Sequence, residues 1–198
     1  LKCFDSIKLW CRVATMDHFS LLENARCIDA GCTAQQVSLH RRADGVFVLS
    51  MVASPVNPEN RWTLDFGRAM HKAFDAVEAE LKADAKGTPA ALLTVSGSSK
   101  FFSNGIDPEW IMSPNTPREE LAEWNDLTMP AFARPILLPI PTICAIGGHA
   151  FGAGFMFALA HDFRMQQSER GFLCAIEVAI GVKTPPPELT LFRYSMSA

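Results

Sequence analysis

Two short apolar runs, each followed by a loop that contains glycine, constrain the fold of this chain more than any other feature of its sequence. They are AALLTVSG, from Ala90 to Gly97, and PIPTICAIGGHA, from Pro139 to Ala150. Runs of this length without polar alternation are typical of strands that are buried on both faces of a sheet. Segments with a helical period separate them from other strand-like segments. The sequence therefore predicts an α/β fold.

The remaining elements follow from period, capping residues and turn residues. Two strands are predicted within VSLHRRADGVFVLSMV, around a turn at residues 43–45, and Thr63 is expected to cap a helix from Leu64 to about Lys82. Other helices are predicted near 108–112, at about 117–137 and over GAGFMFALAHDFRM, residues 152–165. A strand and a loop are expected over 171–185, before a final helix that begins near Pro187. Residues 1–36 show no sustained period, so we interpret them as an extension and 37–198 as the core domain.

Composition excludes several classes of function. The formal net charge of -3 over 198 residues gives no electrostatic basis for binding nucleic acid or an anionic membrane. The longest apolar stretch, 135–160, is interrupted by prolines, glycines and His149, so no membrane span is predicted. The six cysteines have no spacing typical of a zinc module, and we expect Cys144 and Cys174 to be small core residues and no metal to be bound.

The chemistry is expected in the two loops, FFSNGID at 101–107 and GGHAFGAG at 147–154. Backbone N–H groups at a glycine-rich helix N-terminus are unpaired, and they can bind an anion or a developing oxyanion. The second loop lacks the GxGxxG spacing of a dinucleotide site, and no GK[ST] follows it as in a P-loop. Taken alone, each loop is also compatible with plain tight packing.

Taken together, four motifs resemble the enoyl-CoA hydratase/isomerase (crotonase) superfamily. They are KFFSNGID, PTICAIGGHAFGAG, LAHDFRM and GFLCAIEVAIGV, in the order and at the approximate spacing of the family. The residues of these motifs most resemble those of the peroxisomal-type, plant-like Δ3,Δ2-enoyl-CoA isomerases. The resemblance implies a crotonase-like spiral of ββα turns that assembles as a homotrimer or hexamer. Family members continue into further helices, so we expect this chain, which ends at Ala198, to be C-terminally incomplete.

The resemblance also implies roles for individual residues. The N–H groups of Ile106 and Ala153 would form an oxyanion hole, and Glu177 would be the catalytic base. Asp107 has an alternative interpretation as a helix cap. We expect Glu177 to lie on a strand, on the opposite face from both of its neighbours. The residues expected to contact the acyl-CoA are Ser103, Asn104, Gly105, Ile106, Asp107, Gly152 and Met156.

Met156 decides between reactions within the family. Hydratases of the family use two glutamates to hold a water molecule, and Met156 occupies the first of these positions while Glu177 occupies the second. One carboxylate suits an isomerase, which removes a proton from C2 and returns it at C4. His149 and His161 are interpreted as structural residues rather than as acids or bases.

The sequence therefore predicts an enoyl-CoA isomerase of fatty-acid β-oxidation that needs no cofactor beyond the CoA of its acyl-CoA thioester substrate. The expected compartment is the peroxisome, with the mitochondrion or the cytoplasm as alternatives. Two other interpretations remain open: a hydratase or other crotonase-family acyl-CoA enzyme, and a non-catalytic, truncated acyl-CoA-binding homologue.

Overall fold

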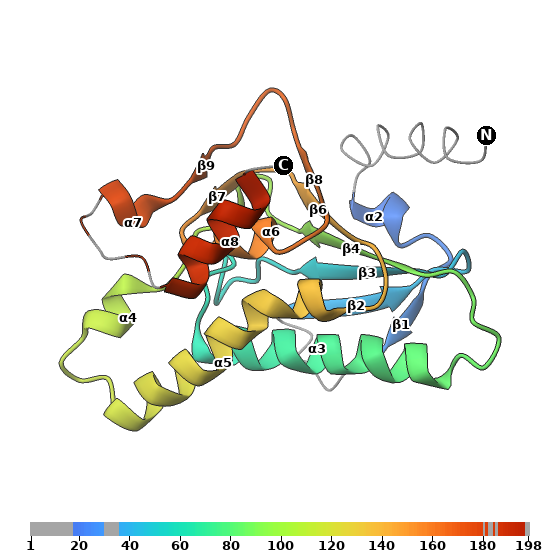
Figure 1. Ribbon diagram of the computed structural model, residues 1–198, viewed down its shortest axis with the longest axis horizontal. Helices are drawn as coiled ribbons and strands as arrows, with labels where there is room; N and C mark the ends of the chain where they lie inside the picture. Colours follow the sequence, from blue (N-terminus) through green and yellow to red (C-terminus); the bar gives the residue numbers. More distant parts are fainter. Residues whose placement is uncertain (1–17, 30–35, 180, 182–183, 185, 197–198) are drawn as a thin grey trace.

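A six-stranded sheet with the order β1-β2-β3-β4-β6-β8 runs through the centre of the protein (Figure 1). The computed structural model describes residues 18–29, 36–179, 181, 184 and 186–196. Strands β1 to β3 are antiparallel neighbours, whereas β3, β4, β6 and β8 are parallel. The strands are β1 (Arg26–Ile28), β2 (Val37–Arg41), β3 (Val46–Met51), β4 (Ala91–Ser96), β6 (Thr142–Ile146) and β8 (Phe163–Gln166).

The sheet begins earlier in the chain than the sequence indicated. Strand β1 pairs with β2, with Arg26 opposite Arg41, and a short helix α2 (His18–Leu21) precedes it. Both elements lie within residues 1–36, which we assigned to an extension, so a domain boundary at residue 37 would cut the sheet. The rest of that segment, 1–17 and 30–35, lies outside the described residues.

A second, three-stranded parallel sheet has the order β5-β7-β9. Each of its strands follows a strand of the large sheet and precedes a helix. The three resulting ββα units are β4, β5 (Phe101–Ser103) and α4 (Pro108–Met112); β6, β7 (His149–Phe151) and α6 (Ala153–Leu159); and β8, β9 (Leu173–Cys174) and α7 (Ile176–Ala179). The predicted α/β fold, a spiral of ββα turns, is therefore confirmed.

Two long helices, α3 (Leu64–Ala83) and α5 (Arg118–Leu137), run side by side along one face of the large sheet (Figure 1). Thr63 caps α3 as predicted, since its Oγ1 accepts from the Phe66 N–H at 3.2 Å. The two helices approach closely at Gly67, where a Cβ would lie 3.6 Å from Thr128 Oγ1. The main core lies between these helices and the sheet. The last helix, α8 (Pro186–Met196), packs against α6.

The predicted helix over residues 152–165 is too long. Helix α6 ends at Leu159, and the chain continues as strand β8 from Phe163. Asp162 causes the turn between them: its Oδ2 accepts from the Thr142 N–H at 2.8 Å and from Thr142 Oγ1 at 2.9 Å. These bonds fix the start of β8 beside β6, where the backbone joins the sheet.

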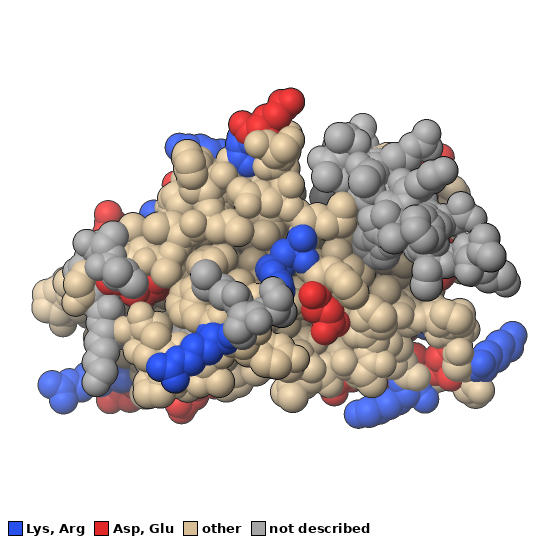
Figure 2. All heavy atoms as spheres, turned by 45° about the horizontal axis from the view of Figure 1, so that its top comes forward, with Lys and Arg blue, Asp and Glu red and all other residues tan. Residues whose placement is uncertain are grey.

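Charged side chains are scattered on the face drawn in Figure 2, and Lys and Arg do not merge into a continuous patch where coloured atoms are visible. Within the described ranges, every helix is too short or too polar to cross a membrane.

Candidate active site

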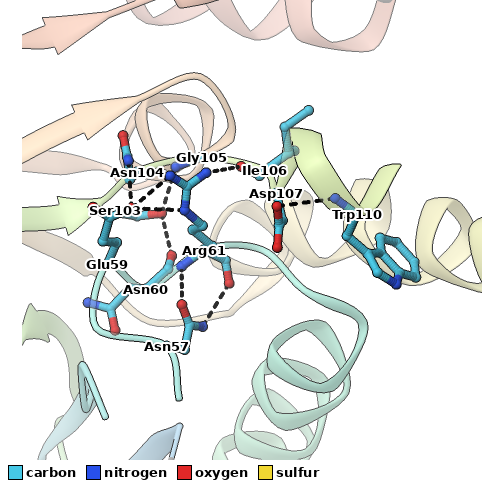
Figure 3. Close-up of polar contacts among 10 residues, drawn as sticks. All are labelled: Asn57, Glu59, Asn60, Arg61, Ser103, Asn104, Gly105, Ile106, Asp107 and Trp110. Carbon is cyan, nitrogen blue, oxygen red and sulfur yellow. Dashed lines mark hydrogen bonds and ion pairs between the residues drawn. The ribbon is translucent and has the colours of Figure 1, made fainter. Parts of the chain in front are cut away.

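The first glycine loop leaves β5 and is held by the segment from Asn57 to Trp62 (Figure 3). Ser103 is fully buried. Its Oγ donates to the carbonyl oxygen of Asn60 at 2.7 Å and accepts from the Gly105 N–H at 3.3 Å. The Trp62 N–H donates to the carbonyl oxygen of Gly105 at 2.8 Å. Ser103 therefore fixes the shape of the loop, and its expected contact with substrate stays a prediction.

Gly105 brings the two glycine loops together. Its φ of 76° lies in the left-handed region, and a Cβ there would lie 2.7 Å from the carbonyl oxygen of Phe151. The same Cβ would lie 3.5 Å from the backbone nitrogen of Ala153. Only glycine therefore permits the first loop to approach the start of α6 this closely.

The second loop turns into α6 at Gly152, whose φ of 50° and ψ of −122° are accessible to glycine and strained for other residues. Gly154 then allows the helix to rest on β5, because a Cβ there would lie 2.5 Å from the carbonyl oxygen of Ser103. The two loops thus pack as one unit at the ends of β5 and β7.

Two backbone N–H groups of this unit have no acceptor among the described residues. Neither the N–H of Ile106 nor that of Ala153 donates a hydrogen bond within the described part of the chain. Ile106 lies at the surface of the loop, with 36% of its area exposed, and Ala153 is the first residue of α6. Unpaired N–H groups on adjacent loops can bind one oxygen atom together.

Glu177 lies on a helix, not on a strand as the sequence indicated. Strand β9 ends at Cys174, and the four-residue helix α7 begins at Ile176. The prediction was wrong because a short apolar run such as Ile176 to Val178 fits either a strand or a turn of helix, and its period cannot distinguish them.

The helix nevertheless directs the carboxyl group of Glu177 to the second glycine loop. A Cβ at Gly152 would lie 2.8 Å from Glu177 Oε1, so the carboxyl group packs against the bare α-carbon. The other oxygen, Oε2, is buried and has no hydrogen-bond partner in the described structure. Buried polar atoms are normally paired, so an unpaired oxygen next to the glycine loop is consistent with a catalytic role or with a site that water or a ligand completes. Glu177 is therefore the strongest candidate for a catalytic group.

Strand β9 holds α7 in place. The Gly152 N–H donates to the carbonyl oxygen of Cys174, and the Ala150 N–H donates to that of Phe172, each at 2.9 Å. The Phe172 N–H in turn donates to Nδ1 of His149 at 3.2 Å, and the His149 ring stacks on the Phe172 ring at 5.4 Å between centroids. His149 thus anchors β9, which agrees with the structural role expected from the sequence.

Three other residues expected at the site have definite positions. Asp107 caps α4, since its Oδ1 accepts from the Trp110 N–H at 3.3 Å. Asn104 is half-buried and donates from Nδ2 to Glu59 Oε2 at 2.8 Å. Met156 is fully buried on α6 within the main core and contributes no polar group. Their expected contacts with acyl-CoA stay predictions.

The model of one protein family, described as enoyl-CoA hydratase/isomerase, matches residues 56–189. The chain belongs to the enoyl-CoA hydratase/isomerase family. The matched range contains the residues of both glycine loops and Glu177, and it begins at the segment that holds the first loop. The family and the fold predicted from the four motifs are therefore confirmed.

Curated relatives of the family include plant isomerases. The chain is 37% identical over 105 residues to "Enoyl-CoA delta isomerase 3" of Arabidopsis thaliana, covering 52% of this chain and 44% of that protein. It is 30% identical over 157 residues to the peroxisomal "Enoyl-CoA delta isomerase 1" of the same plant, covering 79% of this chain and 60% of that one. The chain thus spans about half the length of the curated relatives it matches.

A solved structure shares the fold. It is described as a putative enoyl-CoA hydratase/isomerase (crotonase) from Legionella pneumophila, and it superposes with a TM-score of 0.64 at 22% identity. The match covers 81% of this chain and 58% of that one. Such low identity supports the fold of the family, and the choice of reaction must rest on the residues of the site.

His161 is a core residue of this family member. Its Nδ1 lies 2.9 Å from the carbonyl oxygen of Phe157, and its Nε2 lies 2.8 Å from Thr94 Oγ1. Because a carbonyl oxygen only accepts, Nδ1 carries the proton and Nε2 accepts from the threonine hydroxyl. Burial lowers the pKa of His161 to about 4, so the ring is neutral at physiological pH. It links α6 to β4.

Two cysteines were expected in the core, and no metal site was expected. Cys144 is buried, and burial raises the pKa of its thiol well above the usual value. Cys174 is half-buried on β9, so it is less enclosed than expected. Within the described part of the chain, no group of His, Cys, Asp and Glu side chains could hold a metal ion.

Sequence reasoning missed the residues that support the first loop, namely Glu59, Asn60 and Arg61. Asn60 is almost fully buried with a φ of 49°, and its side chain bonds to Ala53, Ser96 and Phe102. Asn is one of the few residues that adopts this conformation readily, so the Asn-Pro-Glu-Asn run was the available signal. Its contacts, which span 42 residues to Phe102, were not visible in the sequence.

Proposed function

We propose that the protein is a Δ3,Δ2-enoyl-CoA isomerase, which converts a 3-enoyl-CoA to the 2-trans-enoyl-CoA in fatty-acid β-oxidation. The observation that carries this proposal is the carboxyl group of Glu177, whose Oε2 is buried and has no partner among the described residues. It lies beside two glycine loops that each offer an N–H group with no acceptor in the described part of the chain. The names of the plant relatives support the same reaction.

The thioester carbonyl oxygen accepts hydrogen bonds from the N–H groups of Ile106 and Ala153. Glu177 removes a proton from C2, and the electron pair of that C–H bond passes into a dienolate whose charge rests on the carbonyl oxygen. Glu177 then returns the proton to C4 as the double bond forms between C2 and C3. Proton and electrons balance, so the reaction needs no cofactor beyond the CoA of the substrate.

Met156 favours isomerisation over hydration. A hydratase must hold and activate a water molecule between two polar groups, and α6 offers a fully buried thioether where hydratases of the family have a glutamate. One carboxyl group that gives back the proton it removed is sufficient for a double-bond shift.

The setting of the reaction is part of the proposal. The substrate is an acyl-CoA thioester, and the peroxisomal name of one plant relative supports that compartment. The protein would assemble as a homotrimer or hexamer, as the family resemblance implies.

A product assay tests the reaction. The protein is incubated separately with 3-enoyl-CoA and 2-trans-enoyl-CoA, and the products are separated by chromatography. We expect conversion of the 3-enoyl substrate and no 3-hydroxyacyl-CoA from the 2-enoyl substrate. Hydration without isomerisation would replace the proposal by a hydratase. Binding of both compounds without turnover of either would indicate a non-catalytic acyl-CoA binder.

A further inference from the structure

The segment from Glu59 to Trp62 runs beside the first glycine loop and bonds to its successive residues (Figure 3). The Asn104 N–H donates to the carbonyl oxygen of Glu59 at 2.9 Å, and the Trp62 N–H donates to that of Gly105 at 2.8 Å. The loop that offers the Ile106 N–H is thus held from one side along its length.

The bond at Gly105 has a directional consequence. In a trans peptide unit the C=O and the N–H point in opposite directions. Because the carbonyl oxygen of Gly105 is bonded to Trp62, the N–H of Ile106 in the same peptide unit points away from that segment. A hydrogen bond to the carbonyl oxygen also polarises the peptide and makes its N–H a stronger donor.

The side chains of Arg61 and Glu59 bond to the first glycine loop on either side of Gly105, at Ile106 and at Asn104. Arg61 donates from Nη1 to the carbonyl oxygen of Ile106 at 3.2 Å and from Nε to Glu59 Oε2 at 2.8 Å. The same carboxylate oxygen accepts from Asn104 Nδ2 at 2.8 Å. Hydrogen bonds from Asn104 and from Arg61 hold the pKa of Glu59 below its usual value, so it is charged at neutral pH.

We propose that Arg61 and Glu59 are positioning residues that orient the Ile106 N–H for the thioester oxygen. This inference rests on the proposed function, because it concerns the orientation of the N–H group that acts as an oxyanion donor in that reaction. Neither side chain contacts the reacting atoms: Arg61 acts through the Ile106 carbonyl, and Glu59 acts through Arg61 and Asn104.

The alternative is a surface ion pair whose only effect is on stability. Pairs of this exposure contribute little to the free energy of unfolding. The chain contains a matched example in Arg42, which also pairs with a carboxylate two residues away, that of Asp44, at 3.0 Å. Arg42 also donates from Nη1 to a backbone carbonyl oxygen, that of Leu21, at 3.2 Å. The side chains of Arg61 and Arg42 are 31% and 29% exposed.

The test compares Arg61→Met with Arg42→Met in the same protein. We expect Arg61→Met to lower kcat for 3-enoyl-CoA by about tenfold with little change in KM, since a small displacement of an oxyanion donor affects the transition state most. Arg42→Met should leave both constants unchanged, and the two variants should have similar melting temperatures. Arg61→Lys, which keeps the charge and one donor, should restore part of kcat.

A spectroscopic measurement separates this inference from the proposed function. The enolate of acetoacetyl-CoA absorbs in the near ultraviolet, and we expect the oxyanion donors to stabilise this form when the compound binds. The intensity of the band then reports on these donors without any double-bond shift. A weaker band in Arg61→Met than in Arg42→Met supports the positioning role, even if the wild-type protein does not isomerise 3-enoyl-CoA. Equal bands and equal kcat values in the two variants would overturn it, as would the absence of a band in the wild-type protein.

Discussion

The carboxyl group of Glu177 packs directly against the α-carbon of Gly152. A Cβ at Gly152 would lie 2.8 Å from Oε1 of Glu177 and 3.2 Å from Cγ2 of Ile176. The next residue, Ala153, carries an N–H group that has no acceptor among the described residues. The lack of a side chain at Gly152 therefore lets the proposed base pack against the residue that precedes a proposed oxyanion donor.

Gly152→Ala should remove most of the activity. The added methyl group would displace the Glu177 carboxyl group, and we expect kcat to fall by about 100-fold. Gly87→Ala is the control, because Gly87 also has a positive φ, of 61°, but a Cβ there meets nothing within 4 Å. Steady-state kinetics on both variants, with melting temperatures, would check this. Equal activities in the two variants would contradict the packing of Glu177 on Gly152.

Glu177→Gln should abolish isomerisation while acyl-CoA binding persists. Loss of a general base costs about 10²- to 10⁴-fold in kcat, and the amide preserves the shape of the side chain. The melting temperature should not fall, because the change removes a carboxylate oxygen that is buried without a partner. Glu109→Gln on α4, which is exposed, provides the control. Undiminished turnover would remove Glu177 from the mechanism.

Met156→Glu should destabilise the fold rather than create a hydratase. Met156 is fully buried in the main core, and burying an unpaired carboxylate there costs on the order of several kcal/mol. Met156→Leu, which conserves volume, should change the free energy of unfolding by less than about 1.5 kcal/mol. Urea unfolding measures both. A stable Met156→Glu protein that hydrates 2-enoyl-CoA would show that this side chain reaches the substrate.

His161 should make stability fall as the solution is acidified. Its pKa is lowered to about 4 in the folded protein, so the unfolded chain binds a proton first as the pH falls below 6.5. The neutral ring therefore stabilises the fold fully above that pH, and the contribution, of about 3 kcal/mol, is lost between pH 6.5 and 4. We expect His161→Gln to have a smaller slope of unfolding free energy against pH in this window. Identical slopes would contradict the prediction.

Local sequence signals were sufficient for much of the fold. The turn at residues 43–45 lies between β2 and β3, and Thr63 caps α3, because a turn and a cap are determined by adjacent residues. The end of α6 was missed because it depends on Asp162 bonding to Thr142, which is 20 residues away. Secondary structure that is stopped by a distant partner leaves no local mark.

The same limit explains which parts of the site could be predicted. The glycine loops and Glu177 could be proposed from the sequence because each lies in a contiguous motif, and the structure places Gly105 beside Ala153 and Gly152 beside Glu177. Glu59 and Arg61 were missed because their contacts, with Asn104 and Ile106 respectively, each span 45 residues. In a sequence, polar loop residues that make structural contacts cannot be distinguished from solvent-exposed ones until their partners are known.

Because strand β9 is short, we expect the two parts of the site to differ in their resistance to local opening. The first loop is bonded along its length to the segment from Glu59 to Trp62, whereas α7 follows a strand of two residues beside β7. Opening of β9 would move Glu177 away from the site and leave the first glycine loop, with its Ile106 N–H, in place. In the open state the protein would bind acyl-CoA without converting it. The observed turnover would therefore be proportional to the fraction of time that β9 is paired with β7. Amide hydrogen exchange at Gly152, whose N–H bonds to Cys174, reports that fraction.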